Sequence, residues 1–164
     1  MKRFYIFITL VFAGLYTGAQ DYTKSVGLRG GISSGFEYRF FTDDANSYKI
    51  LLSTRDRGIQ LHAFKEFHQY QLFNFTDQLV FYFGAGVHTG FQSWDEVRVR
   101  DHIKWYDTKT RIIAGLDGLA GLDYVFYEVP ISIGVEVKPY FDLFGRDMFK
   151  LQLFDFAFTV RYLF

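Results

Sequence analysis

The sequence predicts an all-β protein, an eight-stranded antiparallel transmembrane β-barrel preceded by a signal peptide. Three observations support this fold class. Aromatic residues make up 21% of the 164 residues, with 21 Phe and 12 Tyr, and aromatic side chains favour strands and the boundary between membrane and water. Apolar and polar residues alternate with a period of two in many segments. A basic and then apolar N-terminal segment indicates export.

Residues 1–20 have the pattern of a secretory signal peptide. Lys2 and Arg3 precede an apolar run over 4–15, and small residues follow up to Ala19. Signal peptidase reads this order of positive, apolar and small residues. The apolar run is shorter than the roughly 20 residues that a transmembrane helix needs. We therefore expect cleavage near residue 20 and a barrel over 21–164, outside the cytoplasm.

The clearest predicted strand lies at the C-terminus. Phe156, Phe158 and Val160 share one face, and Thr159 and Arg161 share the other. Similar or less regular alternation gives eight candidate strands, and eight is the smallest strand number common in bacterial barrels. They are 24–32, 36–40, 48–55, 59–68, 79–88, 114–124, 131–140 and 154–164. Transmembrane strands need about 9–11 residues, so the shorter segments are expected to extend into their connections.

Alternation alone does not say which face is inside, and three features favour a membrane barrel. One face is too bulky for the interior of an eight-stranded barrel. The opposite face carries glycine and charges of both signs, and the last strand ends in the aromatic Phe164. We therefore predict an interior polar network of Glu37, Arg39, Asp117, Asp123, Glu136, Lys138 and Arg161. A soluble periplasmic ligand-binding barrel, with the two faces exchanged, is the alternative.

The connections between the candidate strands fall into two sets. With periplasmic termini, 43–47, 69–78 and 126–130 lie on the periplasmic side. The set 33–34, 56–58, 92–110 and 142–150 then faces outward. Bacterial barrels combine short periplasmic turns with long outer loops, so the polar stretch 92–110 is expected to be an outward loop.

This predicted loop contains both tryptophans of the chain among charges of alternating sign. Exposed Trp, Tyr and Arg are the residue types that anchor interfaces. The candidate residues for binding an extracellular partner are therefore Trp94, Arg98, Arg100, Trp105 and Tyr106. Alternatively, the two tryptophans belong to the aromatic girdle at the membrane boundary.

Several segments resemble the small OmpA/OmpX-like outer-membrane β-barrel proteins, which include porin-family-like barrel domains. The resemblance lies in 26–31 (VGLRGG), 82–88 (YFGAGVH), 115–124 (GLDGLAGLDY), 128–131 (EVPI), 137–139 (VKP) and 161–164 (RYLF), and it covers essentially the whole mature chain. It implies a location in the outer membrane of a Gram-negative cell and contact with its lipid. It also implies that the outer-membrane assembly machinery reads Tyr162 and Phe164.

The composition excludes several kinds of site. The chain has no cysteine, which excludes disulfides, thiolate metal sites and a cysteine nucleophile. Its 18 basic and 18 acidic residues cancel, so a nucleic-acid partner is not expected. We expect no cofactor and no metal, because no close His-x-His pair or acidic cluster has ligand spacing.

The histidines offer one enzymatic alternative. His62, Glu66 and His68 occupy even positions of one predicted strand and therefore share a face. His88, on another predicted strand, can point into the same interior. A His–Glu pair beside a serine would suit a lipid-deacylating triad, but no nucleophile motif accompanies them, so we expect them to fill the barrel by hydrogen bonding.

The expected function is that of a non-enzymatic integral outer-membrane barrel with a structural or surface-interaction role. An outer-membrane lipid-modifying enzyme is one alternative. A narrow channel is another, although a filled eight-stranded interior leaves little room for one.

Overall fold

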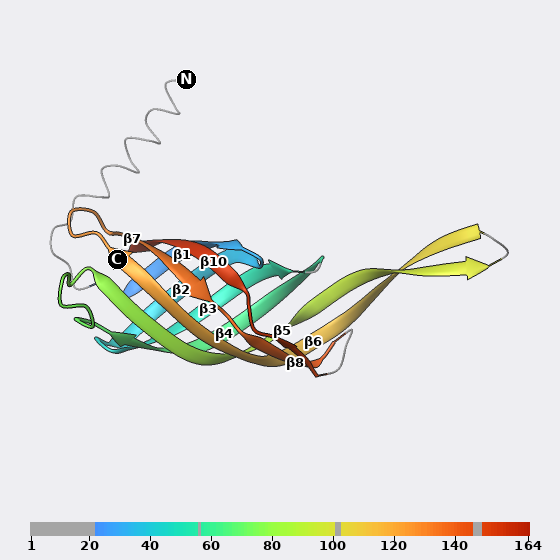
Figure 1. The fold of residues 1–164 in the computed structure, drawn as a ribbon, viewed down its shortest axis with the longest axis horizontal. Helices are drawn as coiled ribbons and strands as arrows, with labels where there is room; N and C mark the ends of the chain where they lie inside the picture. Colours follow the sequence, from blue (N-terminus) through green and yellow to red (C-terminus); the bar gives the residue numbers. More distant parts are fainter. Residues whose placement is uncertain (1–21, 56, 101–102, 146–148) are drawn as a thin grey trace, which may run out of the picture.

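The described part of the chain consists of ten β-strands and their connections (Figure 1). The structure is a computed structural model and describes residues 22–55, 57–100, 103–145 and 149–164. The predicted signal peptide lies outside these residues and stays a prediction. The strands are β1 (Lys24–Gly31), β2 (Ser34–Asp43), β3 (Asn46–Arg55), β4 (Gly58–Gln69), β5 (Leu79–Arg100), β6 (Ile103–Val125), β7 (Ile131–Val137), β8 (Tyr140–Phe144), β9 (Lys150–Gln152) and β10 (Phe156–Leu163).

Antiparallel pairing closes these strands into an eight-stranded barrel. β1 pairs with β2 and with β10, so Val26 lies opposite both Tyr38 and Tyr162. β5 pairs with β4 and with β6. β7 and β8 follow one another along β6, and β10 and β9 follow one another along β7 and β8. Each of these two pairs forms one strand of the wall, and the closed barrel confirms the predicted fold class.

Pro139 accounts for the break between β7 and β8. Proline has no backbone N–H and therefore interrupts a hydrogen-bonded ladder. Gly118 of β6 still donates a backbone hydrogen bond to the carbonyl of Pro139, at 2.7 Å. The backbone N–H of Lys138 donates to the carbonyl of Asp155, at 3.0 Å. The wall thus remains hydrogen-bonded across the break.

The faces of the barrel are inside-out relative to a soluble protein. In β4, buried and exposed residues alternate without exception: Gln60, His62 and Glu66 are fully buried, whereas Ile59 and Leu61 point outward. β10 follows the same rule, with its phenylalanines outside. This is the predicted assignment of the two faces.

Glycines provide the space that large interior side chains need. A Cβ atom at Gly121 would collide with the ring of Tyr82, and a Cβ atom at Gly27 would lie 2.8 Å from Cγ of Arg161. Tyr82 and Arg161 are both almost completely buried. The interior therefore depends on these two glycines to accommodate its largest polar groups.

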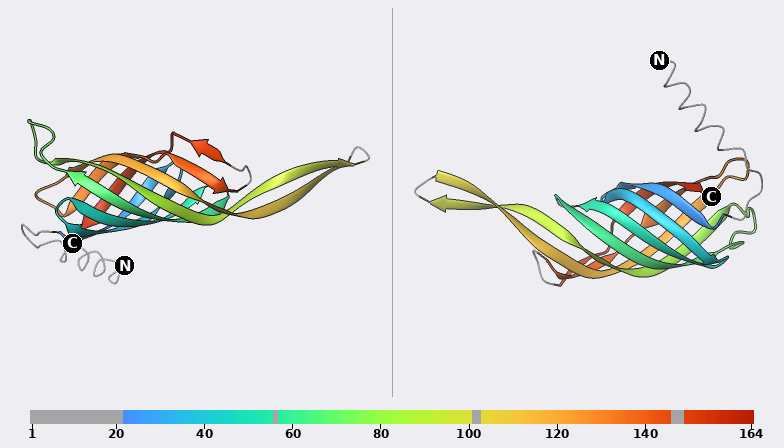
Figure 2. Two further views of the ribbon diagram at one scale, coloured as in Figure 1. Left: turned by 90° about the horizontal axis from the view of Figure 1, so that it is seen from below. Right: turned by 180° about the vertical axis from the view of Figure 1, so that it is seen from behind.

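The two ends of the barrel differ. The end that carries Phe164 and the connections 44–45, 70–78 and 126–130 is called the terminal end (Figure 1). The opposite end is called the ribbon end, because β5 and β6 extend beyond the barrel there as a two-stranded β-ribbon (Figure 2). The sorting of connections between the two ends is as predicted.

The prediction that residues 92–110 form a loop is wrong, because most of this segment belongs to the two strands of the ribbon. β5 and β6 stay paired from Gln92 opposite Arg111 as far as Arg100 opposite Ile103. The predicted contrast of short turns and long loops also fails. Arg55 pairs with Gly58 in a tight hairpin at the ribbon end, whereas the terminal end has the long connection 70–78.

The physical reason is that a ribbon standing in solvent buries neither face. Period-two hydrophobicity marks a strand only where one of its faces is buried. Residues 92–110 therefore look polar and irregular although they contain good strand formers such as Val97.

Candidate functional site

A network of ion pairs fills the half of the interior nearer to the terminal end. It is called the terminal-half network, and each of its members is at most 4% exposed. Its members are the cations Arg29, Arg39, Lys49 and Arg161 and the carboxylates Glu37, Glu66, Asp123 and Glu136. Arg29 also pairs with Asp155 toward the ribbon end and so links this network to the rest of the interior. Each of these groups has a partner of opposite sign, and an unpaired buried charge would cost several kcal/mol.

Lys49 and Arg39 cross-link the strands of this network. The Lys49 Nζ atom lies 2.7 Å from Glu136 Oε2 and 3.0 Å from Glu66 Oε1. Arg39 Nε lies 2.6 Å from Glu66 Oε2, and Arg39 Nη1 lies 3.2 Å from Asp123 Oδ2. Each of these two cations therefore pairs with carboxylates from two different strands.

Arg161 of β10 occupies the centre of the network. Its Nη2 donates a hydrogen bond to the hydroxyl of Tyr82 at 3.0 Å, and Tyr82 in turn donates to Glu136 Oε2 at 3.0 Å. Arg161 also pairs with Glu37 and Asp123. This side chain ties the last strand to four others.

All seven predicted members of the interior polar network lie inside the barrel. Five belong to the terminal-half network, whereas Asp117 and Lys138 lie closer to the ribbon end. The prediction omitted Lys49 and Arg29, although a signal was available. Each alternates with outward neighbours, such as Ile50 beside Lys49.

A second cluster lies toward the ribbon end and is called the His–Asp cluster: His62, His88, Asp117, Ser53 and Asp142. His62 Nδ1 lies 2.7 Å from Asp117 Oδ2, and His88 Nδ1 lies 3.0 Å from Asp117 Oδ1. The other ring nitrogens face further polar groups, since His62 Nε2 lies 2.9 Å from Ser53 Oγ and His88 Nε2 lies 2.9 Å from Asp142 Oδ1. The sequence predicted that His62 and His88 share the interior and fill it by hydrogen bonding, and it placed Asp117 in the interior polar network, as the structure has them. It did not predict that they meet one another together with Ser53 and Asp142, because the five residues come from five strands and meet only through the barrel register.

Ser53, His62 and Asp117 have the order of contacts of a Ser–His–Asp triad. However, Ser53 and His62 are both completely buried. The serine that contacts both Glu66 and His68 is Ser47, which lies 2.7 Å from His68 Nε2 and donates to Glu66 Oε2. There the carboxylate binds the hydroxyl instead of the second ring nitrogen, so it does not orient a histidine base.

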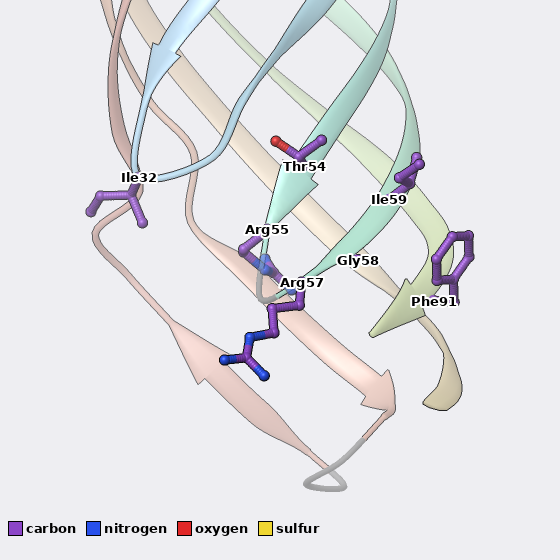
Figure 3. A pocket seen from close by; sticks show the side chains of 7 residues that line it. All are labelled: Ile32, Thr54, Arg55, Arg57, Gly58, Ile59 and Phe91. Atoms are coloured by element: carbon purple, nitrogen blue, oxygen red, sulfur yellow. The ribbon is translucent and has the colours of Figure 1, made fainter. Parts of the chain in front are cut away.

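A hollow of about 590 Å³ lies at the ribbon end, around the β3–β4 hairpin (Figure 3). It is lined by Ile32, Thr54, Arg55, Arg57, Gly58, Ile59 and Phe91. Arg55 is buried, its guanidinium lies 3.7 Å from the centre of the Tyr140 ring, and its Nη2 lies 3.4 Å from Asp142 Oδ2. Arg55 therefore connects the hollow with the His–Asp cluster.

Cross-strand contacts hold the base of the ribbon. Ser93 and Thr110 share a hydrogen bond at 2.9 Å, and Thr108 donates to Asp95 at 2.9 Å. Arg57 of the β3–β4 hairpin also binds Asp95. The hydrogen bonds from Arg57 and Thr108 lower the pKa of Asp95 below its ordinary value, because both stabilise the carboxylate.

Of the five predicted interaction residues, only the side chain of Trp94 falls within the described ones, and it is half-buried. The side chains of Arg98, Arg100, Trp105 and Tyr106 lie outside them, so their role stays a prediction. Trp94 lies at the base of the ribbon, because β4 pairs with β5 only up to Phe91.

The two predicted assembly residues lie on the closing strand. The rings of Tyr162 and Phe164 stack with centroids 6.1 Å apart. The carbonyl of Phe164 accepts hydrogen bonds from the backbone N–H groups of Thr23 and Lys24. Recognition by the assembly machinery stays a prediction.

No helix among residues 22–55, 57–100, 103–145 and 149–164 is long and apolar enough to cross a membrane.

Comparison with solved structures shows that the fold occurs in a known protein. No protein-family model and no curated protein matches the sequence. The N-terminal β-barrel domain of OprF from Pseudomonas aeruginosa aligns with 86% of this chain and 95% of its own chain, with a TM-score of 0.50 and 13% sequence identity. At this identity the likeness concerns the fold alone. The chain thus has an outer-membrane-type, eight-stranded β-barrel fold similar to that of the OprF domain.

Proposed function

We propose that the chain is a non-enzymatic integral barrel of the outer membrane, with a filled interior, which presents the β5–β6 ribbon outside the cell as an interaction element. The observation that carries this proposal is the inside-out distribution of side chains. Phe158 is 74% exposed on the outer face, whereas Arg161 on the same strand is 1% exposed. Lipid is the solvent in which this arrangement is stable.

Water would be a poor solvent for the outer face. The exposed apolar side chains continue around the wall and include Leu28, Phe36, Ile50, Leu52, Leu61, Val87, Leu116, Ile133, Val135, Phe156 and Phe158. Soluble monomers rarely expose contiguous apolar patches of such extent. A closed barrel also satisfies its backbone hydrogen bonds within the wall, as hydrocarbon surroundings require.

The filled interior supports a structural role in preference to conduction. The terminal-half network and the His–Asp cluster occupy successive levels of the barrel, and their charged groups are paired across it. An eight-stranded barrel has room for little more than its own side chains. We therefore expect no ion conductance.

The ribbon supports the interaction role. β8 pairs with β6 up to Ala114, and β4 pairs with β5 up to Phe91. Among the described residues, the strands beyond these points pair only with each other, so each has a free edge. Free edges accept an added strand through backbone hydrogen bonds, and an extended segment of an extracellular protein fits this surface.

Heat-modifiability on unboiled gels tests the membrane barrel. We expect protein from outer-membrane fractions to change mobility on boiling, and the form lacking Phe164 to show this shift weakly. A protein that stays in buffer without detergent and shows no shift would instead be the soluble periplasmic barrel. Discrete conductance steps in planar bilayers would establish the channel alternative.

Cysteine labelling in intact cells tests the orientation. The chain has no cysteine, so Val97→Cys in the ribbon and Phe75→Cys in the 70–78 connection each create a single thiol. Both native side chains are exposed. A membrane-impermeant maleimide should label Cys at 97 in intact cells and Cys at 75 only after lysis. The reverse pattern would refute the proposed orientation and the extracellular ribbon.

A lipid-modifying enzyme is the second candidate, favoured by the contact order of Ser53, His62 and Asp117. Its difficulty is that the serine is completely buried, so a substrate would have to enter the barrel. Release of fatty acid from outer-membrane lipid that disappears in Ser53→Ala, with the gel shift retained, would establish this activity.

A further inference from the structure

Three neighbouring strands bring together the donor set of a metal site. His62 of β4, His88 of β5 and Asp117 of β6 each place one potential ligand atom within 4.8 Å of the other two. Two imidazole nitrogens and one carboxylate oxygen suit borderline divalent metals such as Zn²⁺ and Co²⁺. We propose that the His–Asp cluster binds one such cation through His62 Nδ1, His88 Nδ1 and a carboxylate oxygen of Asp117.

The backbone already holds the ligands close to the required spacing. His62 lies directly opposite His88 in the β4–β5 register, and Asp117 lies on β6, the next strand of the wall. The two histidine nitrogens are 2.7 and 3.0 Å from the carboxylate. Zinc bonds of roughly 2.0–2.2 Å in a tetrahedron place ligand atoms about 3.3 Å apart. Small side-chain shifts therefore admit the ion, and a fourth position stays open.

Two buried atoms at the outer side of the cluster provide an independent observation in favour of a bound cation. His88 Nε2 and Asp142 Oδ1 lie 2.9 Å apart, yet neither has a hydrogen-bond partner of acceptable geometry within the described residues. When a neutral His88 ring carries its proton on Nδ1, for Asp117, its Nε2 is an acceptor that faces another acceptor.

A cation on Nδ1 resolves this conflict. The ring proton then resides on Nε2, from which it is donated toward Asp142. His62 has the equivalent outer partner, since its Nε2 lies 2.9 Å from Ser53 Oγ. A carboxylate or another acceptor behind each ligating histidine is the usual arrangement at protein metal sites.

The charge of the interior also favours an added cation. Among the described residues, six buried cations face seven buried carboxylates. Arg29 pairs with both Glu136 and Asp155, so the two clusters share this surplus of one negative charge. A doubly protonated His88 would also supply a positive charge, and the experiment must separate this possibility from metal binding.

The hollow at the ribbon end provides a route for the ion. Arg55 lines that hollow (Figure 3). It also contacts Asp142, which lies next to His88. The Arg55 side chain therefore lies between the hollow and the cluster. The bound ion would join β4, β5 and β6 just below the point where the ribbon leaves the barrel, and this inference does not depend on what the ribbon binds.

Titration of the untagged protein with Zn²⁺ and Co²⁺ tests the proposal. The full mature chain is refolded into detergent after chelator treatment, and folding is checked by the gel shift. We expect one saturable Zn²⁺ site per chain and, with Co²⁺, the intense visible absorption of a low-symmetry nitrogen–oxygen site. Absence of saturable binding by the folded protein would overturn the proposal and leave a protonated His88 as the source of the charge.

Three variants localise the site. His62→Gln and His88→Gln should each weaken Zn²⁺ binding at least 100-fold, and Asp142→Asn by about 10–100-fold. His68→Gln is the matched control, because His68 is a buried histidine on the same strand as His62 but lies beside Glu66 of the terminal-half network. Zn²⁺ binding by this variant should be unchanged. Binding retained in both the His62 and His88 variants would overturn the assignment. If these variants do not fold, the Co²⁺ spectrum of the native sequence decides, since a surface ion gives only weak octahedral bands.

Discussion

The ammonium group of Lys49 on β3 lies 2.7 Å from the carboxylate of Glu136 on β7, in the completely buried interior of the barrel. The two residues are 87 positions apart in the sequence. The pair exists only because the barrel closes and brings the two strands to face one another. The charged interior therefore depends on closure, and its contribution to stability can be measured.

Removal of this cation should destabilise the barrel strongly. Lys49→Met leaves Glu136 and Glu66 without their shared partner, and loss of one member of a buried ion pair costs about 3–5 kcal/mol. The urea concentration at which the gel shift disappears measures the effect. Lys65→Met is the matched control, because Lys65 lies on the outer face of β4. Equal effects of the two substitutions would show that the buried pairs contribute nothing specific.

A side chain that fills the space beside the Tyr82 ring should also destabilise the barrel. Gly121→Ala places a methyl group against the Tyr82 ring, and overpacking of this kind costs about 1–3 kcal/mol. Gly30→Ala provides the control, since a Cβ atom there has no neighbour within 4 Å. In a urea titration, Gly121→Ala should unfold at a clearly lower urea concentration than Gly30→Ala. A Gly121 variant as stable as the Gly30 variant would mean that the Tyr82 ring can move aside at little cost.

A charge on the outer face should distinguish lipid from water. Phe158→Arg is expected to destabilise the barrel in bilayers by about 2–4 kcal/mol if position 158 lies near the membrane midplane. Val97→Arg introduces the same side chain on the ribbon, beyond the barrel, and should have no comparable effect. Reversible unfolding in phospholipid vesicles provides the measurement. Indifference of the barrel to Phe158→Arg would contradict the proposed membrane span.

The base of the ribbon should loosen in acid. Because the pKa of Asp95 is lowered in the folded state, its contribution is present above the unfolded pKa and is lost as the pH falls through the folded one. The protection factors of the amides of residues 92–97, which are exchange rates corrected for the intrinsic effect of pH, should therefore fall at acid pH, below the ordinary titration range of aspartate. Arg57→Gln should remove part of this pH dependence. Protection factors that do not change with pH in the native sequence would show that the Arg57–Asp95 contact does not hold the ribbon.

Alternation along the sequence was sufficient to predict the barrel wall. In β4, every second residue from Ile59 onward faces outward, and this order is visible in the sequence itself because the outer face is apolar and the interior is polar. The same rule placed Asp117, Glu136 and Arg161 in the interior. Segment 36–40 was predicted shorter than β2, since its ends lie among polar residues near the rim.

The His–Asp cluster and the ribbon could not be predicted in this way. Which residues share a level inside the barrel depends on the stagger between strands, and one sequence does not encode that stagger in any local pattern. His62 and Asp117 therefore gave no recognisable spacing. The ribbon was missed for the opposite reason, because no buried face imposes alternation on residues 92–110.

Pairing between β1 and β10 has a consequence for the timing of assembly. The first and last strands of the wall are partners, with Leu28 opposite Val160. The edges of both strands stay unpaired until both strands are present, so the hydrogen-bonded ring is completed only after the last strand has been made. The entropy of joining these distant segments must be overcome before closure stabilises the molecule. A chain that ends before β10 would keep an open strand edge, which can pair with other chains.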